Sequence, residues 1–458
     1  MAHLPPFEVE ITGLGPKGIG LGVAPDGRPI KVPFAPPGAR VLVLPLGRRK
    51  GEWSARRLAI VRPPAGWQVP PCPQFSVCGG CTLQDLTLDA QRAAKQGLVL
   101  HEVGPIAPDV TVHPIRGTDA ATGYRNKLEL TFGSRRWLAE SDRGEPIEGR
   151  WLGFHAPGRF DRVVDAPTCS LAGPVASRAI AVTRTLALTD ESPVAYDPRT
   201  HAGFWRHLLL REAAGKLLVG IYTTPADDEQ ARHVERLALA LREDPAVGGV
   251  IWMENASVAD VARGAVRATW GDPILEERLG TRTFRLATTT FFQTNTAAAA
   301  VLYDVIGEAV GTGRTLYDLY CGIGSIGLYL ADRFERIVGV EEVEDAVAHA
   351  REHAAANGVD ASYHAGRMEA LLPVLLDDTE AAVVVDPPRA GLHPSVAARL
   401  GALQARVLVY VACNAASLGR DRAILEAGGW RLTDLWTVDL FPQTGHVEAV
   451  GRFTRGDA

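Results

Sequence analysis

Three side chains near the carboxyl end of the chain are of types, and at spacings, that could carry out one reaction together. Cys413 ends the β-forming run VLVYVA, and Asn414 and a helical pattern follow it. Asp386 ends a second apolar run 27 residues earlier, and Glu448 lies 35 residues later in FPQTGHVE. Open α/β sheets gather reactive groups at the carboxyl ends of their strands. The spacing therefore predicts a thiol nucleophile, an acid at the mouth of the sheet and a candidate base, carried by the last three strands.

The chemistry that best suits this set is methyl transfer to C5 of a uracil ring. Uracil C5 is a weak nucleophile, but a thiolate that adds to C6 pushes electrons toward O4 and makes C5 enolate-like. C5 then attacks a methyl sulfonium, a base removes the C5 proton, and the thiolate leaves. The reaction needs a soft nucleophile and a separate carboxylate base, and Cys413 and Glu448 fit these roles. A lone cysteine at a strand end is more often a packing residue, which is the role we predict for Cys321.

The stretch TLYDLYCGIGSIGLYLA has the pattern of a strand, a glycine loop and a helix. Gly322, Gly324 and Gly327 spell G-x-G-x-x-G, and such glycines let a backbone approach a ligand at a helix amino terminus. The next strand, RIVGVE, ends in Glu341, a good acceptor for ribose hydroxyls. The loop and this acid alone fit NAD as well as S-adenosylmethionine. The rigid turn made by two prolines after Asp386, beside a strand-end thiol, favours S-adenosylmethionine.

The order of patterns along the chain predicts three domains. Alternating strands and helices in residues 286–458 indicate a doubly wound, Rossmann-like α/β fold, and the residues discussed above make it the candidate S-adenosylmethionine-dependent methyltransferase domain. Residues 64–285 carry strand patterns such as FWRHLLLRE and LLVGIYT with an amphipathic helix, which indicates an antiparallel α+β region. Residues 1–63 contain short strands separated by Gly and Pro, which indicates a small five-stranded, OB-like β-barrel.

The distribution of charge suggests a polyanionic partner. The net charge of −5 argues against nucleic acid, but residues 1–63 hold ten Lys and Arg against four Asp and Glu, whereas residues 286–458 hold thirteen against twenty-two. A basic amino end on an acidic body suits a polyanion-binding module attached to a catalytic domain; a basic surface without a partner is the alternative. Basic residues flank Trp53, whose ring could stack on a base. Arg206 and His207 could line an RNA groove, although ordinary alternating strand positions explain them equally well.

Four cysteines in the first half of the chain are spaced as ligands. Cys72, Cys78 and Cys81 form C-x5-C-x2-C, and Cys169 is a distant fourth. Four thiolates can hold zinc or an iron–sulfur cluster. Zinc sites tend to use paired knuckles, and only one pair is present, whereas the long gap and the Gly-Gly step suit a loop around a larger object. We therefore predict a structural or RNA-orienting [4Fe–4S] cluster, with zinc and free buried thiols as alternatives.

The compartment follows from what the sequence lacks. No apolar run approaches membrane-spanning length, and MAHLPPFEVE has neither the basic nor the apolar segment of a signal peptide. We therefore expect a cytoplasmic protein with no membrane association. In that compartment cysteines are more often ligands or catalysts than disulfides.

Six motifs, in order along the chain, carry a specific resemblance: FFQTNT, DLYCGIGSIGL, VGVE, DPPRAG, YVACN and FPQTGHVE. With the barrel and the four cysteines, they resemble the RNA 5-methyluridine methyltransferase family, in particular the 23S ribosomal RNA (uracil-5-)-methyltransferases that carry a TRAM domain and a [4Fe–4S] cluster. The tRNA branch of the family generally lacks these additions. We therefore expect a monomer that acts on 23S rRNA, with the same reaction on tRNA as the alternative.

The resemblance also implies roles for individual residues. The positions expected to bind S-adenosylmethionine are Gln293, Tyr320, Gly322, Gly324, Ser325, Glu341 and Asp386. Cys413 would be the nucleophile and Glu448 the base. The helix at residues 86–103 would pack on the catalytic domain although it precedes the central one. One departure is Ala415, where the family commonly has Pro after Cys-Asn; the loss of Pro loosens the turn without removing a chemical group.

Two functions from other classes stay open at this point. A basic barrel and a cysteine cluster would suit an RNA-binding assembly factor with a vestigial methylase fold, although the complete catalytic set argues against it. The glycine loop alone would suit an NAD-dependent oxidoreductase. Stabilisation of the protein by NAD, but not by S-adenosylhomocysteine, would identify that case.

Overall fold

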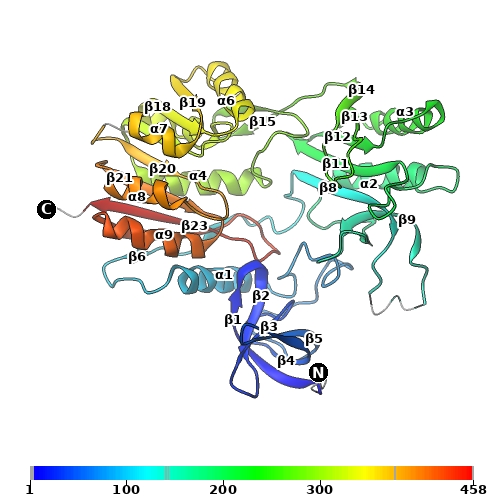
Figure 1. Cartoon of the computed structure of the whole chain (residues 1–458), viewed down its shortest axis with the longest axis horizontal. Coiled ribbons are helices and arrows are strands. Elements are labelled where there is room, and N and C mark those ends of the chain that lie inside the picture. The colour runs from blue at the N-terminus through cyan, green and yellow to red at the C-terminus, as the bar shows by residue number, and fades with distance from the viewer. Residues whose placement is uncertain (1–4, 140–141, 143, 376–377, 456–458) are drawn as a thin grey trace.

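The structure is a computed structural model that describes residues 5–139, 142, 144–375 and 378–455. The chain folds into a small barrel, a seven-stranded sheet and a nine-stranded sheet, with a two-stranded hairpin of β15 (Leu275–Leu279) and β16 (Arg282–Leu286) between the sheets in sequence. In Figure 1 the barrel, in blue, lies below, and the two sheets lie side by side above it. The amino-terminal barrel predicted from the sequence is therefore present.

The barrel closes in the order β1-β2-β3-β5-β4, with β4 paired back to β1. Alternate side chains along each strand point inward and build a core that includes Val9, Ile11, Ile30, Val41 and Val43. Its strands are β1 (Phe7–Gly15), β2 (Ile19–Val23), β3 (Pro29–Val32), β4 (Arg40–Arg49) and β5 (Glu52–Arg62). A short turn, Pro16–Gly18, connects β1 to β2.

Trp53 is not the exposed stacking platform that the sequence suggested. Its ring is 9% exposed, its Nε1 donates to Asp26 Oδ2 at 3.1 Å, and the Arg48 guanidinium lies 4.9 Å from the ring centroid. The neighbouring Arg57 is paired with Asp85 at 3.0 Å, so it ties the barrel to the cysteine-containing segment. Closure of the barrel thus buries the aromatic ring and engages part of the basic cluster internally.

The central sheet has the strand order β10-β9-β8-β11-β12-β13-β14. Its strands pair antiparallel except β12 with β13, which are parallel because helix α3 (Asp228–Arg242) crosses between them. Helices α2 (Pro174–Ala187) and α3 bury one face of the sheet. The strands are β8 (Lys127–Arg135), β9 (Glu148–His155), β10 (Val163–Asp165), β11 (Trp205–Ala213), β12 (Lys216–Thr223), β13 (Val247–Glu254) and β14 (Ala265–Gly271).

Arg206 and His207, considered above as RNA contacts, are buried in this sheet. Each is 1% exposed. Arg206 Nη1 donates to the carbonyls of Asn255 and Ser257 at 3.1 and 2.7 Å, and His207 Nε2 lies 3.0 Å from Asp260 Oδ1. These contacts hold the segment between β13 and β14, so the two side chains support the domain and do not face RNA.

The nine-stranded sheet is doubly wound, as predicted. Its order is β19-β18-β17-β20-β21-β23-β22-β6, with β7 also paired to β22. Separate apolar cores lie on its two faces, one with α4, α5 and α6 and the other with α1, α8 and α9. The strands are β17 (Gly313–Leu319), β18 (Phe334–Glu341), β19 (Ala361–Ala365), β20 (Ala382–Val385), β21 (Val407–Ala412), β22 (Trp430–Asp439) and β23 (Glu448–Arg455). The helices are α4 (Thr296–Val310), α5 (Ser325–Tyr329), α6 (Glu344–Ala356), α7 (Met368–Leu375), α8 (Pro394–Ala402) and α9 (Ala415–Ala427).

After the barrel the chain first packs against the nine-stranded sheet and only then enters the seven-stranded sheet. Helix α1 (Leu88–Val103) buries Leu98, Val99 and Val103 in the same core as α9. The two helices approach closely at Gly419 of α9. A Cβ added there would lie only 2.6 Å from the Glu102 carbonyl oxygen of α1. Strands β6 (Thr111–Val112) and β7 (Arg116–Gly117) then pair with β22. The helix therefore packs where the family resemblance implied.

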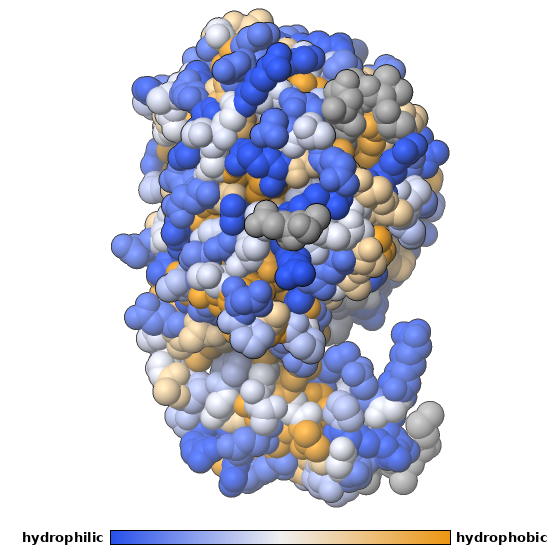
Figure 2. All heavy atoms as spheres, turned by 90° about the vertical axis from the view of Figure 1, so that its left-hand side faces the viewer, coloured by the Kyte–Doolittle hydropathy of each residue, from blue (hydrophilic) through white to orange (hydrophobic). Residues whose placement is uncertain are grey.

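The outer surface is mixed in polarity. Figure 2 shows hydrophilic side chains over most of one face, with smaller apolar patches between them, and the barrel as a narrower lower lobe. None of the helices in the described part of the chain is long and apolar enough to span a membrane.

Candidate active site

The ends of four neighbouring strands meet at one edge of the nine-stranded sheet. Leu319 of β17 pairs with Val385 of β20, and Val385 pairs with Tyr410 of β21. On its other side β21 pairs with the antiparallel strand β23, where Ala412 faces Ala449. The sheet therefore brings together the residues that come directly after or before these pairs: Tyr320, Asp386, Cys413 and Glu448. The order of strands reverses between β17 and β20, which is where doubly wound sheets bind their ligands.

Cys413 follows β21 in the chain and lies exposed in a small pocket that is also lined by α1, by the loop after β20 and by residues 445–447. Loss of hydration, together with the nearby carboxylates of Glu448 and Asp386, raises the pKa of its thiol to about 11, while Arg389 opposes this shift. Asn414 Nδ2 donates to the Arg389 carbonyl at 3.2 Å and so ties the end of β21 to the loop after β20. Ala415 is the first residue of α9, a position that also tolerates Pro, so the departure from the family pattern leaves the helix start in place.

Glu448 is a buried acid, and Asp386 beside it is partly exposed. Glu448 is 6% exposed, and burial, with the nearby Asp386 charge, raises its pKa well above the ordinary value. Burial raises the pKa of Asp386 to about 7. Two adjacent carboxyls, one of them buried, cannot both ionise easily, so their protonated forms are favoured until a positive charge comes close. Perturbed acids of this kind are concentrated at functional sites.

The glycine loop after β17 has the shape expected of a cofactor cradle. Tyr320 has a left-handed backbone (φ 63°), and such strain in a non-glycine residue is typical of functional sites. Gly324 (φ 79°) precedes α5, and a Cβ there would lie 2.6 Å from the Tyr363 hydroxyl. The Glu341 carboxylate accepts hydrogen bonds from the Gly322 and Val343 amides at 3.1 and 2.9 Å. The acid at the end of β18 therefore fixes the glycine loop.

Asp318 is a further candidate site residue that none of the sequence motifs indicated. It is fully buried in β17, its Oδ2 accepts from the Gly327 amide at 2.9 Å, and its Oδ1 has no hydrogen-bond partner in the described structure. Burial raises its pKa to about 7. Asp318 thus supports the glycine loop from behind. An acid inside an otherwise apolar strand, LYDLY, was the signal that could have identified it.

Gln293 precedes helix α4 in the chain, and Ser325 contacts this helix. Gln293 is in the segment before α4, where its carbonyl accepts from Asn126 Nδ2 of the central domain at 2.9 Å. Ser325 begins α5, and its Oγ is 2.8 Å from the Tyr303 hydroxyl of α4. Helix α4 therefore connects both predicted cofactor positions to the same core.

The loop of residues 440–447 leads into Glu448 and is held by distant parts of the chain. Lys95 of α1 donates to the Phe441 carbonyl at 2.9 Å, and its ammonium also pairs with the buried Asp439. The Tyr124 hydroxyl donates to the Pro442 carbonyl at 2.8 Å. Further hydrogen bonds join this loop to Gln91, Thr82, Leu83 and Asn295. The position of the candidate base therefore depends on α1, on the cysteine-containing segment and on the central domain.

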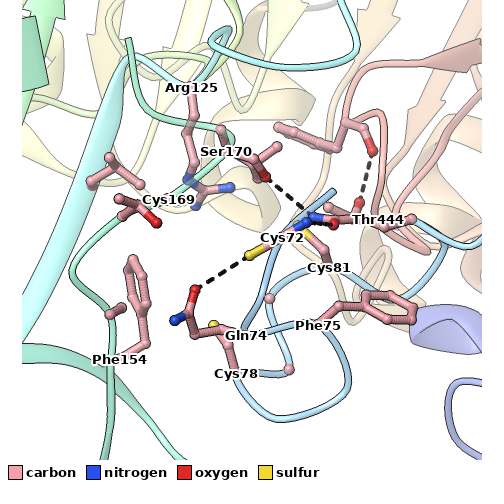
Figure 3. Close-up of a pocket in the computed structure, with 18 of the residues that line it drawn as sticks. Cys72, Gln74, Phe75, Cys78, Cys81, Arg125, Phe154, Cys169, Ser170 and Thr444 are labelled. Atoms are coloured by element: carbon pink, nitrogen blue, oxygen red, sulfur yellow. Dashed lines mark hydrogen bonds between the residues drawn. The ribbon is translucent and has the colours of Figure 1, made fainter. Parts of the chain in front are cut away.

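The four predicted ligand cysteines surround one cavity of about 530 Å³ (Figure 3). Cys72, Cys78 and Cys81 come from one loop and Cys169 from the segment before α2. Burial raises the pKa values of Cys78 and Cys81 to about 11 and 12, with the other cysteines contributing. In the described ranges, no three His, Cys, Asp or Glu side chains are arranged to hold a metal ion. The thiols thus surround a space and do not converge on a point.

The fold and the site define the class of S-adenosylmethionine-dependent methyltransferases. The model of the tRNA (uracil-5-)-methyltransferase family matches residues 275–454. An uncharacterized RNA methyltransferase of Caldanaerobacter subterraneus is 33% identical over 452 residues, with 97% of each chain covered. The chain therefore belongs to the tRNA (uracil-5-)-methyltransferase family of RNA methyltransferases.

Two further relatives match over nearly the whole length. An uncharacterized RNA methyltransferase of Chlorobaculum tepidum is 34% identical, with 98% of this chain and 96% of that protein covered. The Pyrococcus abyssi tRNA (uracil-54, C5)-methyltransferase in complex with S-adenosyl-L-homocysteine matches 98% of this chain and 100% of its own, with a TM-score of 0.75 and 26% identity. A protein named for tRNA thus shares the full architecture, so the domains that precede the catalytic one do not by themselves indicate rRNA, contrary to our expectation.

Proposed function

We propose that this RNA uracil-5 methyltransferase uses Cys413 as its nucleophile and Glu448 as its base, and that 23S rRNA is its substrate. The observation that carries the proposal is the meeting of this thiol and this carboxylate at adjacent strand ends, beside Asp386 and the glycine loop. One chain supplies every residue of the set, which suits a monomer.

In the proposed reaction the Cys413 thiolate adds to C6, and the electron pair of the C5–C6 double bond moves toward O4. When bound, S-adenosylmethionine supplies an electrophilic methyl group on a cationic sulfur. C5 takes this methyl group as the carbon–sulfur bond of the donor breaks, which leaves S-adenosylhomocysteine. Glu448 accepts the C5 proton, the double bond re-forms, and the bond between C6 and the Cys413 sulfur breaks to return the thiolate. The uracil must leave its stack to expose C6 to the thiol.

The residues proposed to hold the cofactor come from three adjacent strand ends, from the start of α5 and from the segment before α4: Gln293, Tyr320, Gly322, Gly324, Ser325, Glu341 and Asp386. Support for this cradle comes from the left-handed Tyr320, the closely packed glycine loop and the Glu341 carboxylate that fixes it. A cationic sulfur beside Asp386 and Glu448 would lower the pKa of both carboxyls. Glu448 would then be ionised and able to accept a proton when the reaction begins.

We also propose that Cys72, Cys78, Cys81 and Cys169 hold a [4Fe–4S] cluster. A cluster is wider than a single ion, so it suits thiols that surround a cavity of this size. With a cysteine at each iron, no iron would have an open position, so the cluster would be structural. It would fix the segment whose Thr82 and Leu83 amides hold the 440–447 loop. Bound iron would also keep the thiols deprotonated.

The test of the function is methyl transfer from labelled S-adenosylmethionine to unmodified 23S rRNA and, in parallel, to tRNA, with anaerobically purified protein. We expect label in 5-methyluridine of 23S rRNA. Label only in tRNA would keep the mechanism and replace the substrate, and the name of the Pyrococcus abyssi relative makes tRNA the second candidate. No label in either RNA, from protein with its full metal content, would favour a non-enzymatic RNA-binding role.

Two variants complete this test. Cys413→Ala should lose methyl transfer while S-adenosylhomocysteine still stabilises it against heat, which shows that the site has folded. Methylation at the wild-type rate by Cys413→Ala would contradict the assigned nucleophile.

For the cluster, the measurement is iron and acid-labile sulfide per chain in the anaerobic protein. We expect four of each per chain from the [4Fe–4S] stoichiometry, fewer in Cys169→Ser, and zinc in place of iron would overturn the assignment.

A further inference from the structure

The turn between β1 and β2 of the barrel docks against the loop that carries the candidate base. A Cβ on Gly445 would lie 2.0 Å from the Gly18 amide nitrogen, and a Cβ on Gly18 would lie 2.2 Å from Thr82 Oγ1. Side chains do not fit at either glycine unless the backbones move apart. Figure 1 shows the same arrangement, with the loop before β23 descending toward the top of the β1–β2 hairpin. The barrel is therefore packed against the active-site loop and is not a module on a free tether.

This docking places a basic side chain of the barrel at the nucleophile. The pocket that holds Cys413 and Asn414 is also lined by Pro16 and Lys17. Lys17 has a left-handed backbone (φ 62°), which costs free energy for a residue with a side chain and persists where the surrounding structure imposes it. Backbone strain of this kind is concentrated at functional sites. The turn is thus built to present Lys17 at this position.

Lys17 and Arg389 are the cations of this pocket. Both are exposed, and in the described part of the chain neither has a carboxylate partner within ion-pair distance. Glu102 lines the same pocket, but it is not paired with either of them. Two free positive side chains from separate elements, beside a thiol that must meet an RNA base, provide a site for phosphate groups.

We propose that Lys17 is a substrate-positioning residue, which binds the RNA backbone phosphate next to the target uridine and, with Arg389, holds the strand across Cys413. This inference rests on the proposed function. A flipped nucleotide exposes the phosphates on both of its sides, and a lysine contacts them as a flexible point charge. The barrel would therefore contribute a residue to the active site itself, in addition to any binding of more distant RNA.

The test compares substitutions at Lys17 with one at a matched lysine. Lys17→Gly removes the charge but favours the left-handed backbone of the turn, so the fold is expected to survive. Lys17→Arg restores the charge. Lys31→Ala is the control, because Lys31 is an exposed lysine of the same barrel that does not line the pocket. Its Nζ pairs with Glu52 Oε2 at 2.6 Å. The substrate for all these variants is whichever RNA, 23S rRNA or tRNA, the wild-type protein methylates in the methyl-transfer assay.

We expect Lys17→Gly to lower kcat/KM about tenfold, mainly through KM, with Lys17→Arg and Lys31→Ala within about twofold of wild type. RNA affinity measured in a Cys413→Ala background should lose about 0.7 from the slope of log Kd against log salt, as for one single-strand phosphate contact. An unchanged KM and salt slope in Lys17→Gly would overturn the role of Lys17 while leaving the function intact. If the wild-type protein methylates no RNA, the proposed function fails, and the role of Lys17 fails with it.

Discussion

Cys413 and Glu448 lie at the two sides of one rung of the sheet. Ala412 of β21 faces Ala449 of β23 in the antiparallel ladder, and the thiol residue follows the first while the carboxylate residue precedes the second. Glu448 is also paired on its other side with Val438 of β22. Because a slip of one residue would turn a side chain to the opposite face, the register of these three strands fixes the geometry of nucleophile and base.

Replacement of Glu448 should separate bond formation from proton removal. In Glu448→Gln the thiol can still add to C6 and the methyl group can transfer, but the C5 proton has no acceptor, so the covalent protein–RNA adduct should accumulate. We expect methylated, released RNA to form about 10²–10⁴-fold more slowly, the usual value of general-base catalysis. Denaturing gels with labelled RNA measure the adduct. Glu426→Gln, an exposed glutamate on α9, is the matched control, and rapid product release by Glu448→Gln would refute the assigned base.

The raised carboxyl pKa values predict that cofactor binding depends on pH. Without a cation nearby, the carboxyl groups of Asp386, with a pKa of about 7, and of Glu448, also raised, retain protons near neutral pH. A sulfonium favours their ionised forms, so binding releases protons, and the affinity for S-adenosylmethionine should increase between pH 6 and pH 8, by at most about tenfold per unit for each proton. The neutral sulfur of S-adenosylhomocysteine should give a weaker dependence. Calorimetry in buffers of different ionisation enthalpy tests this, and equal pH dependence for the two ligands would contradict it.

The charge of Glu448 should also control the reactivity of the thiol. Because the Glu448 carboxylate helps to raise the pKa of Cys413 to about 11, Glu448→Gln should lower that pKa and speed alkylation by iodoacetamide at pH 8 when bound S-adenosylmethionine keeps Glu448 ionised in the wild type. The direction follows because only the thiolate reacts. Peptide mass spectrometry distinguishes Cys413 from the other five cysteines. Slower alkylation in Glu448→Gln would mean that the two groups do not share one electrostatic environment.

The buried pair of Lys95 and Asp439 should be essential for stability. Both side chains are fully buried, and Asp439 Oδ2 has no hydrogen-bond partner among the described residues. Lys95→Met leaves the buried carboxylate with only Arg92, whose Nε lies 3.8 Å from Asp439 Oδ2, so we expect a loss of about 3 kcal/mol in the free energy of unfolding. Lys31→Met, which breaks an exposed pair with Glu52, should cost less than about 1 kcal/mol. Urea denaturation measures both, and equal losses would show that burial of the pair does not matter.

Docking of the barrel can be tested with two glycines that share one backbone conformation. Gly18 (φ +75°) abuts Thr82, whereas Gly27 (φ +79°) has no atom within 4 Å of an added Cβ. Alanine at either position should cost about 1–2 kcal/mol from the left-handed backbone. Only Gly18→Ala should also displace the 440–447 loop and lower kcat. Equal activity of Gly18→Ala and Gly27→Ala would show that the barrel turn does not support the active site.

The sequence by itself indicated the methyltransferase class and the local elements of this protein. The thiol at the end of β21, the glycine loop and the acid after β20 were predicted as site residues because parallel strands in a doubly wound sheet bring their carboxyl ends to one edge. The barrel strands followed from alternating hydrophobicity and turn residues. The four cysteines, 97 residues apart at most, were grouped by residue type and by the C-x5-C-x2-C spacing of the first three, and the fold places them around one cavity.

Only the tertiary structure decided which distant side chains support that chemistry. Lys95 and Asp439 are 344 residues apart, and Gln91 and Gln443 are 352 apart, so no local pattern could pair them. The basic residues around Trp53 suggested that its ring could stack on a base, but whether a ring faces solvent depends on how the strands close into a barrel. Here closure of the barrel buries Trp53. The approach of Lys17 to Cys413 depends on how the barrel docks, and that contact follows from the shapes of the folded domains, because a short-range pattern carries no information about another domain's surface.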